Sequence, residues 1–169
     1  MIVTLDIPDH LRFQLVYRME RKSPYEVTLD PKWRFEFLNS PLQGLRSFGA
    51  IASYAGKAGA AKSLAKLATS RRKMYMICQG GRAVSVGWCM IGKCGYYKIE
   101  SDAVVIGPIW TSDEIRGQGL APKALELAIN QLIRDGHSLF YIDTEKMNLP
   151  AQRVFAKCGF GTPIASYIR

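Results

Sequence analysis

Hydrophobic and polar residues alternate most regularly from residue 74 onward. The apolar stretches MYMICQ and AVSVGWCMI flank the pair Gly80–Gly81. This pattern predicts a β-hairpin, because glycine readily adopts the positive φ that a tight turn requires. A third strand is expected from about Lys98 to Thr111, and its AVVI centre is continuously apolar. Such a run is typical of a strand that is buried on both faces.

Two segments with helical spacing follow this strand, and each precedes a further strand. Residues Gly119–Arg134 place their apolar side chains mainly on one side and predict an amphipathic helix. Pro150–Cys158 predicts a second helix, which Gly159 would end. The strands are expected at Leu139–Glu145 and at Thr162–Ile168.

The first third of the chain has a weaker pattern. A short strand is predicted at Phe13–Met19, whereas residues 23–41 show no clear period. Residues 45–69 are rich in Ala, Lys and Leu, and we expect Gly56 and Gly59 to split them into two helices. The pattern contains strands and helices but no internal repeat and no long linker. It therefore predicts one α+β domain of six strands, over residues 1–169.

Composition excludes several classes of protein. Of the 169 residues, 48% are hydrophobic and 22% are charged, as in an ordinary globular protein. No apolar stretch is long enough to cross a bilayer, and the N-terminal segment lacks the pattern of a signal peptide. A cytoplasmic location is therefore expected. Four cysteines without a CxxC pair, and only two histidines, favour reduced thiols over a zinc site, so no metal is expected.

The net charge of +9 is uneven along the chain. Residues 1–73 hold 13 Lys/Arg against 6 Asp/Glu, whereas residues 74–169 hold 10 against 8. A basic half is consistent with nucleic acid or an anionic membrane surface as a partner. A solvated helix face that only aids solubility explains it equally well.

A glycine-rich turn, within TSDEIRGQGLAPKAL, lies between the third strand and the amphipathic helix. The first N–H groups of a helix have no partner within it, and the helix dipole adds partial positive charge there. A phosphate group satisfies both. Gly117, Gly119 and the small Ala121 leave the backbone open to its approach. The turn matches neither of two other phosphate-binding motifs. A P-loop would need Gly-Lys-Ser/Thr, and a dinucleotide fingerprint would need a third glycine and a later acidic residue.

The run Arg116–Ala121 resembles the R/Q-x-x-G-x-G/A signature of GNAT-type N-acetyltransferases, which holds the pyrophosphate of acetyl-CoA. The segment NLPAQRVFAKCGF resembles a second family motif through Asn148, Ala151, Gly159 and Phe160. The likeness covers roughly residues 74–168. It implies a mixed, mostly antiparallel sheet with helices on both faces, in α/β/α layers. It also implies that acetyl-CoA, as co-substrate, contacts Ile109, Trp110, Thr111, Arg116, Gly117, Gln118, Gly119, Leu120, Ala121, Asn148 and Phe155.

The family places the cofactor where two central parallel strands splay apart. Gly107–Pro108 is expected to form a bulge in the first of them, because proline cannot complete a central ladder. A backbone N–H nearby would then stabilise the oxyanion. The sequence also stops soon after its sixth predicted strand, although family members often have a seventh. Either that strand is missing or a partner supplies it, and the second case implies a homodimer.

Proton transfer is less well defined than cofactor binding. The resemblance favours Asp102 or Glu100 as the base, with Glu145 as a third candidate. The family commonly has a tyrosine acid at the position of Phe155, which cannot donate a proton. Tyr141 is the alternative donor. The neighbouring helices are basic, and this favours an acidic amine acceptor.

Two other functions stay open. Phe155 favours a module that binds acyl-CoA without catalysis. The cluster Arg71–Lys73, with Tyr54 and Tyr75 nearby, favours nucleic-acid binding, although no recognised motif for it is present. Of the three hypotheses, we expect the acetyltransferase of a primary amine, acting by direct attack in a ternary complex.

Overall fold

The computed structural model describes residues 12–169, so nearly all of the N-terminal segment that lacks a signal-peptide pattern lies outside the described residues. Seven strands form one sheet in the order β2-β3-β4-β5-β6-β1-β7. The helices and strands have these bounds: β1 Phe13–Glu20, β2 Arg34–Leu38, α1 Pro41–Arg46, α2 Phe48–Leu67, β3 Arg72–Gln79, β4 Arg82–Ile91, β5 Val104–Thr111, α3 Leu120–Arg134, β6 Leu139–Glu145, α4 Leu149–Lys157 and β7 Ala165–Ile168.

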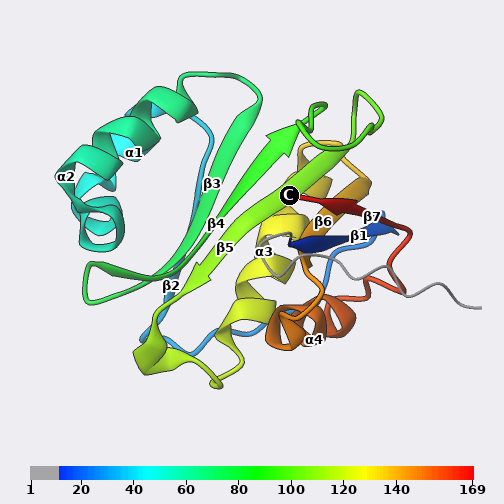
Figure 1. The fold of residues 1–169 in the computed structure, drawn as a ribbon. Coiled ribbons are helices and arrows are strands. Elements are labelled where there is room, and N and C mark those ends of the chain that lie inside the picture. The colour runs from blue at the N-terminus through cyan, green and yellow to red at the C-terminus, as the bar shows by residue number, and fades with distance from the viewer. Residues whose placement is uncertain (1–11) are drawn as a thin grey trace, which may run out of the picture.

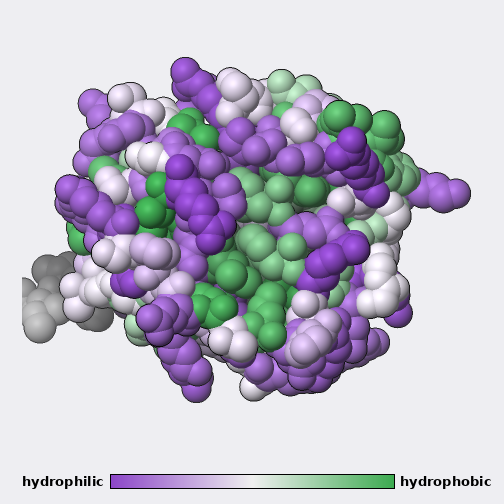
Figure 2. All heavy atoms as spheres, turned by 180° about the vertical axis from the view of Figure 1, so that it is seen from behind, coloured by the Kyte–Doolittle hydropathy of each residue, from purple (hydrophilic) through white to green (hydrophobic). Residues whose placement is uncertain are grey.

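Helices cover both faces of the sheet, as the α+β prediction required (Figure 1). Helix α2 packs on β2, β3 and β4 through residues such as Ile51 and Leu67. On the opposite face, α3 and α4 enclose a larger core with Leu125, Ile129 and Phe155. All strand pairs are antiparallel except β5 with β6. Hydrophilic side chains cover most of the far side of the molecule, and hydrophobic residues gather near its centre (Figure 2).

Local sequence explains most of these elements. Helix α3 buries Ala124, Ala128 and Leu132 at intervals of four residues, which is the spacing of one helix face. The break expected in residues 45–69 occurs at Gly56, whose φ of 71° and ψ of 167° are not helical. Gly59, by contrast, continues the helix. A separate short helix, α1, precedes these two parts and was not predicted; it begins at Pro41 after the N-cap Ser40.

The prediction of six strands was too low by one. Strand β2 lies within residues 23–41, which show no clear period, and it is a five-residue edge strand that pairs only with β3. The residues RFEFL do alternate between polar and apolar, but five residues inside an otherwise irregular segment give too short a run to stand out. The N-terminal strand β1 lies between β6 and β7. The chain thus supplies seven strands itself, and the idea of a strand that is missing or donated by a partner was wrong.

The third predicted strand, Lys98–Thr111, begins later than expected. Residues 92–103 form a loop with a turn, in which the N–H of Ala103 donates to the carbonyl of Glu100. Strand β5 therefore starts only at Val104. This shortening moves Glu100 and Asp102 out of the strand.

Strands β5 and β6 separate halfway along their length, as expected from Gly107–Pro108. Their parallel pairing ends at Ile106 and Ile142. Strand β5 continues to Thr111 against β4, with a register shift between Gly87 and Cys89, and β6 continues against β1. Pro108 has no N–H to extend a ladder. The predicted bulge and the splay are both confirmed.

Candidate active site

A cleft of about 1330 Å³ passes through this splay. At one end it is lined by the glycine-rich turn before α3 and by α4. Its middle is lined by residues 107–111 of β5 and 142–145 of β6. At the other end it reaches the start of β3, the end of β4 and the loop at 93–96. One continuous space therefore joins the glycine-rich turn to the opposite face of the sheet.

The turn has the backbone geometry that an anion requires. Gly117 and Gly119 adopt φ of 81° and 73°, and Gly119 is the N-cap of α3. A Cβ added at either glycine would meet nothing within 4 Å, so the backbone is approachable. No acceptor in residues 12–169 takes the amide hydrogens of Gly117, Gly119, Leu120 or Ala121. Unpartnered amides at a helix start make an anion site, and the turn fits a pyrophosphate.

Arg116 is fixed beside this turn. Its Nε donates to the carbonyl of Thr111 at 3.2 Å, and Nη1 lies 2.6 Å from Asp113 Oδ1. Both side chains of the ion pair are largely exposed, so the pair contributes little to stability. The bond to Thr111 ties the turn to the end of β5.

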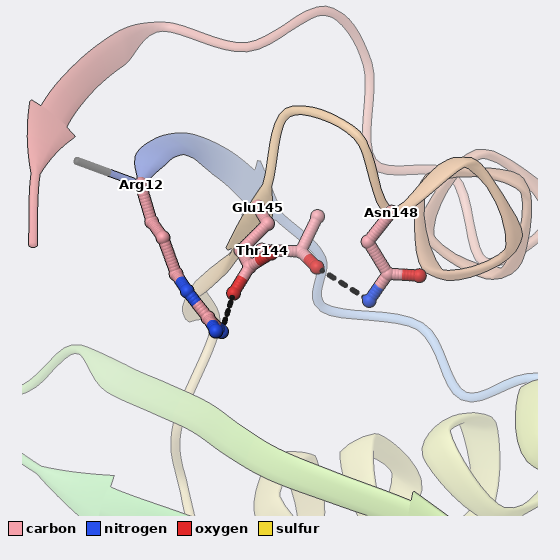
Figure 3. A network of polar contacts seen from close by, with 4 residues as sticks. All are labelled: Arg12, Thr144, Glu145 and Asn148. Atoms are coloured by element: carbon pink, nitrogen blue, oxygen red, sulfur yellow. Dashed lines mark hydrogen bonds and ion pairs between the residues drawn. The ribbon is translucent and has the colours of Figure 1, made fainter. Parts of the chain in front are cut away.

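The wall formed by β6 and α4 is organised by Asn148 (Figure 3). Its Oδ1 caps α4 by accepting from the N–H of Ala151 at 3.3 Å, and its Nδ2 donates to Thr144 Oγ1 at 3.0 Å. Arg12, the residue before β1, reaches Glu145, with Nη1 2.6 Å from Oε1. Asn148 thus positions the start of α4 against the end of β6.

Phe155 projects from α4 into the same wall. The side chain is 3% exposed and meets the ring of Tyr17 edge to face, with 5.4 Å between centroids. Of the residues expected to contact the cofactor, all but one line the cleft: Ile109, Trp110, Thr111, Arg116, Gly117, Gly119, Leu120, Ala121, Asn148 and Phe155. The exception is Gln118, whose side chain turns back to the carbonyl of Glu114 at 3.4 Å.

The structure does not bring the expected bases to the cleft. Asp102 is exposed in the turn before β5, at the end opposite to the glycine-rich turn. Glu100 accepts the hydroxyl of Tyr141 at 2.8 Å, and this bond, with nearby Arg18, lowers the pKa of Glu100. Tyr141 is 6% exposed and engaged with Glu100, so the alternative acid also lies outside the cleft. The third candidate, Glu145, does line it.

Asp143 also lines the cleft, although it was not predicted as a site residue from the sequence. Side chains alternate along β6, and Asp143 lies on the sheet face opposite to Ile142 and Thr144. Its Oδ2 accepts the hydroxyl of Tyr97 at 3.0 Å, and burial, together with the Asp143 carboxylate, raises the pKa of Tyr97. The signal was an acid directly after the apolar run LFYI inside strand β6, because burying a carboxylate is unfavourable unless it has a role or a partner.

Two features are absent from the part of the chain that the structure describes. None of the helices within residues 12–169 is both long and apolar enough to cross a membrane. In the same part of the chain, no three His, Cys, Asp or Glu side chains are grouped closely enough to hold a metal ion.

One family model and several solved structures match this chain. The model of the acetyltransferase (GNAT) family matches residues 48–160. No curated protein sequence matches the chain. Among solved structures, a GNAT-family acetyltransferase from Colwellia psychrerythraea has a TM-score of 0.64 and 16% identity over 93% of this chain and 54% of its own. A Drosophila protein has a TM-score of 0.63 and 10% identity over 94% of this chain and 50% of its own.

A third similar structure is the aminoglycoside N-acetyltransferase AAC(6')-Iy in complex with CoA. It has a TM-score of 0.62 and 16% identity over 81% of this chain and 95% of its own. At these identities the likeness concerns the fold. This chain spans about half the length of the Colwellia and Drosophila proteins.

Proposed function

This chain belongs to the acetyltransferase (GNAT) family, and we propose that it transfers an acetyl group from acetyl-CoA to a primary amine within a ternary complex. The family resemblance carried by Arg116–Ala121 and the segment from Asn148 to Phe160 is thereby confirmed. One observation carries the proposal: the unpartnered amides of the glycine-rich turn open into the same cleft as the β5–β6 splay.

The turn would hold the pyrophosphate of CoA. The amides of Gly117, Gly119, Leu120 and Ala121 supply the donors, and the N-terminus of α3 adds partial positive charge. Arg153 and Lys157 line the cleft from α4 and add positive charge at the same end. Past Ile106, β5 has no strand on its β6 side, so backbone groups between Ile109 and Thr111 are available to orient the thioester and its oxyanion.

Asp143 is the proposed proton acceptor. An alkylamine with a pKa near 10.4 must lose a proton to attack, and a carboxylate in the cleft can receive it directly or through water. Glu145 also lines the cleft, but it is paired with Arg12. Phe155 offers no proton to the departing thiolate, so solvent in the cleft would supply one. The chain then contributes mainly the orientation of its two substrates, which can provide a large part of the rate enhancement.

Titration calorimetry with CoA tests the site. Gly119→Glu should weaken binding at least about 100-fold, because it puts bulk and negative charge where the phosphates would lie. The matched control is Gly136→Glu, at the other end of α3, where φ is also positive (94°) and the space is also open. Equal CoA affinity in the two folded variants would overturn the assignment.

A panel of amines, assayed with acetyl-CoA by release of free thiol, tests the reaction. We expect turnover with at least one amine and a large loss in Asp143→Asn. The second candidate function, a module that binds acyl-CoA without catalysis, is favoured by Phe155. Tight CoA binding with no turnover on any amine would support that module and contradict the enzyme.

A further inference from the structure

We infer that the amine acceptor of this enzyme carries an anionic group, and that a cluster of cations on the face of the sheet opposite to α3 recognises it. This inference rests on the proposed function and names its substrate class. The cations line the part of the cleft beyond the splay. We name this part the acceptor arm, and the residues that line it are Thr69, Arg71, Arg72, Met90, Lys93 and Tyr96.

The topology brings these residues together from separate elements. Thr69 follows α2, Arg71 and Arg72 begin β3, and the N–H of Ile91, at the end of β4, donates to the carbonyl of Arg71. Lys93 lies two residues after Ile91, in the loop that follows β4. Arg169, after β7, also lines the cleft and lies over the ring of Tyr96, 4.9 Å from its centroid. Four cationic side chains therefore surround the entrance to the acceptor arm.

These cations lack anionic partners in the described part of the chain. No carboxylate in residues 12–169 forms an ion pair with Arg71, Arg72, Lys93 or Arg169. Asp143 and Glu145 are the only carboxylates from those residues that line the cleft, and Glu145 is paired with Arg12. A cleft lined mainly by one sign of charge concentrates ligands of the opposite sign.

The phosphates of CoA do not account for the cluster. Strand register places Arg72 beside Met90, and Met90 beside Val105. From Val105 to Thr111, where β5 reaches the glycine-rich turn, six residues of strand span about 20 Å. A pyrophosphate at the turn is out of reach of an arginine at that distance. The cations must serve something on the other side of the reacting carbonyl, which is where the acceptor enters.

The register also limits the shape of the acceptor. Ile109, at the splay, is four residues of β5 from Val105, or about 13 Å along the strand, and Arg72 lies two strands from Val105, or about 10 Å across the sheet. The Cα atoms of Arg72 and Ile109 are therefore about 16 Å apart. After allowing for the reach of an arginine side chain, the anionic group and the reacting amine are about 6–10 Å apart. A phosphorylated amino sugar has this span. Arginine pairs well with phosphate because it can donate two parallel hydrogen bonds. A polycationic amine, such as an aminoglycoside, would be repelled.

Matched acceptors test the inference. Glucosamine 6-phosphate, glucosamine and the polycationic neamine present similar amines with different charge. We expect kcat/KM to be at least about 30-fold higher for the phosphorylated sugar than for glucosamine, with neamine poorest, because hydrogen bonds between arginine and phosphate are charge-assisted and strong. A carboxylated amine of the same span separates a need for phosphate from a need for any anion, and preference for either anion supports the inference.

Arg72→Gln provides the structural test. The preference for glucosamine 6-phosphate over glucosamine should fall about 10-fold, through a higher KM for the phosphorylated sugar, while the Kd for CoA is retained. Lys73→Gln is the control, because it removes the same charge one residue away on β3 but does not line the cleft. It should leave the preference unchanged. Circular dichroism confirms that both variants are folded.

The outcomes separate this inference from the proposed function. If CoA binds and glucosamine or neamine is the better acceptor, the inference is overturned and the acetyltransferase stands. Equal effects of Arg72→Gln and Lys73→Gln would also overturn it, because general surface charge would then explain the preference. If CoA fails to bind to the wild-type protein, both fall together.

Discussion

Gly87 of β4 is a position where one added carbon should destabilise the whole sheet. It pairs with Ile109, directly beside the splay, and faces the ring of Tyr75 on β3. A Cβ built on Gly87 lies inside 3.0 Å of two carbons of that ring and of its hydroxyl oxygen. Carbon atoms in contact are normally about 3.5–4.0 Å apart, so ring or backbone must move by about 1 Å or more. Tyr75 has 0% exposure and therefore has no free space to move into.

Overpacking of this kind costs about 1–3 kcal/mol. For a protein of this size, each kcal/mol lowers Tm by about 2–4 °C, so Gly87→Ala should lower Tm by about 2–12 °C. Urea unfolding followed by circular dichroism measures the free energy directly. Gly161→Ala is the control, because a Cβ there meets nothing within 4 Å and the φ of Gly161 is ordinary. That variant should be as stable as the wild type or slightly more stable.

The ring itself is tested in a double-mutant cycle. Tyr75→Phe keeps the clashing carbons, so the cost of Gly87→Ala should persist in that background. Tyr75→Leu removes them, and the cost should shrink by at least about 1 kcal/mol. If Gly87→Ala is as stable as Gly161→Ala, or if Tyr75→Leu brings no relief, steric contact with the ring is not what requires glycine at this position.

Two further predictions concern α4 and the thiols. Asn148→Ala should lower the free energy of unfolding, measured with urea, by about 1–2 kcal/mol through loss of the α4 cap. Asn148→Asp retains a capping oxygen and should be nearly as stable as the wild type. An equal loss of stability in both variants would contradict the capping role. Burial raises the pKa of Cys78 to about 11 and that of Cys158 to about 12, and it also raises the pKa of the fully buried Cys89. At pH 8, therefore, only Cys94 should react quickly with a disulfide reagent. At a pKa of 11 only about a thousandth of a thiol is ionised at pH 8, and a second fast thiol in the folded protein would refute this.

The sequence by itself determined the features that depend on neighbouring residues. The open, glycine-rich turn follows from two glycines at positive φ before a strongly amphipathic helix, and both features are local. The cap of α4 by Asn148 and the interruption of β5 at Gly107–Pro108 are local as well. The family, the cofactor end of the cleft and the splay could therefore be predicted from the sequence.

The tertiary structure decided whatever depends on pairing between distant segments. Strand β1 lies between β6 and β7, more than 100 residues away in the chain, and no local pattern encodes that choice. The same long-range register puts Asp143 in the cleft and leaves Asp102 outside it, although both are acids near strands. It also collects Arg71, Arg72 and Lys93 at one end of the cleft. Local periodicity fixes which residues share a face, but only the register between strands decides which faces meet.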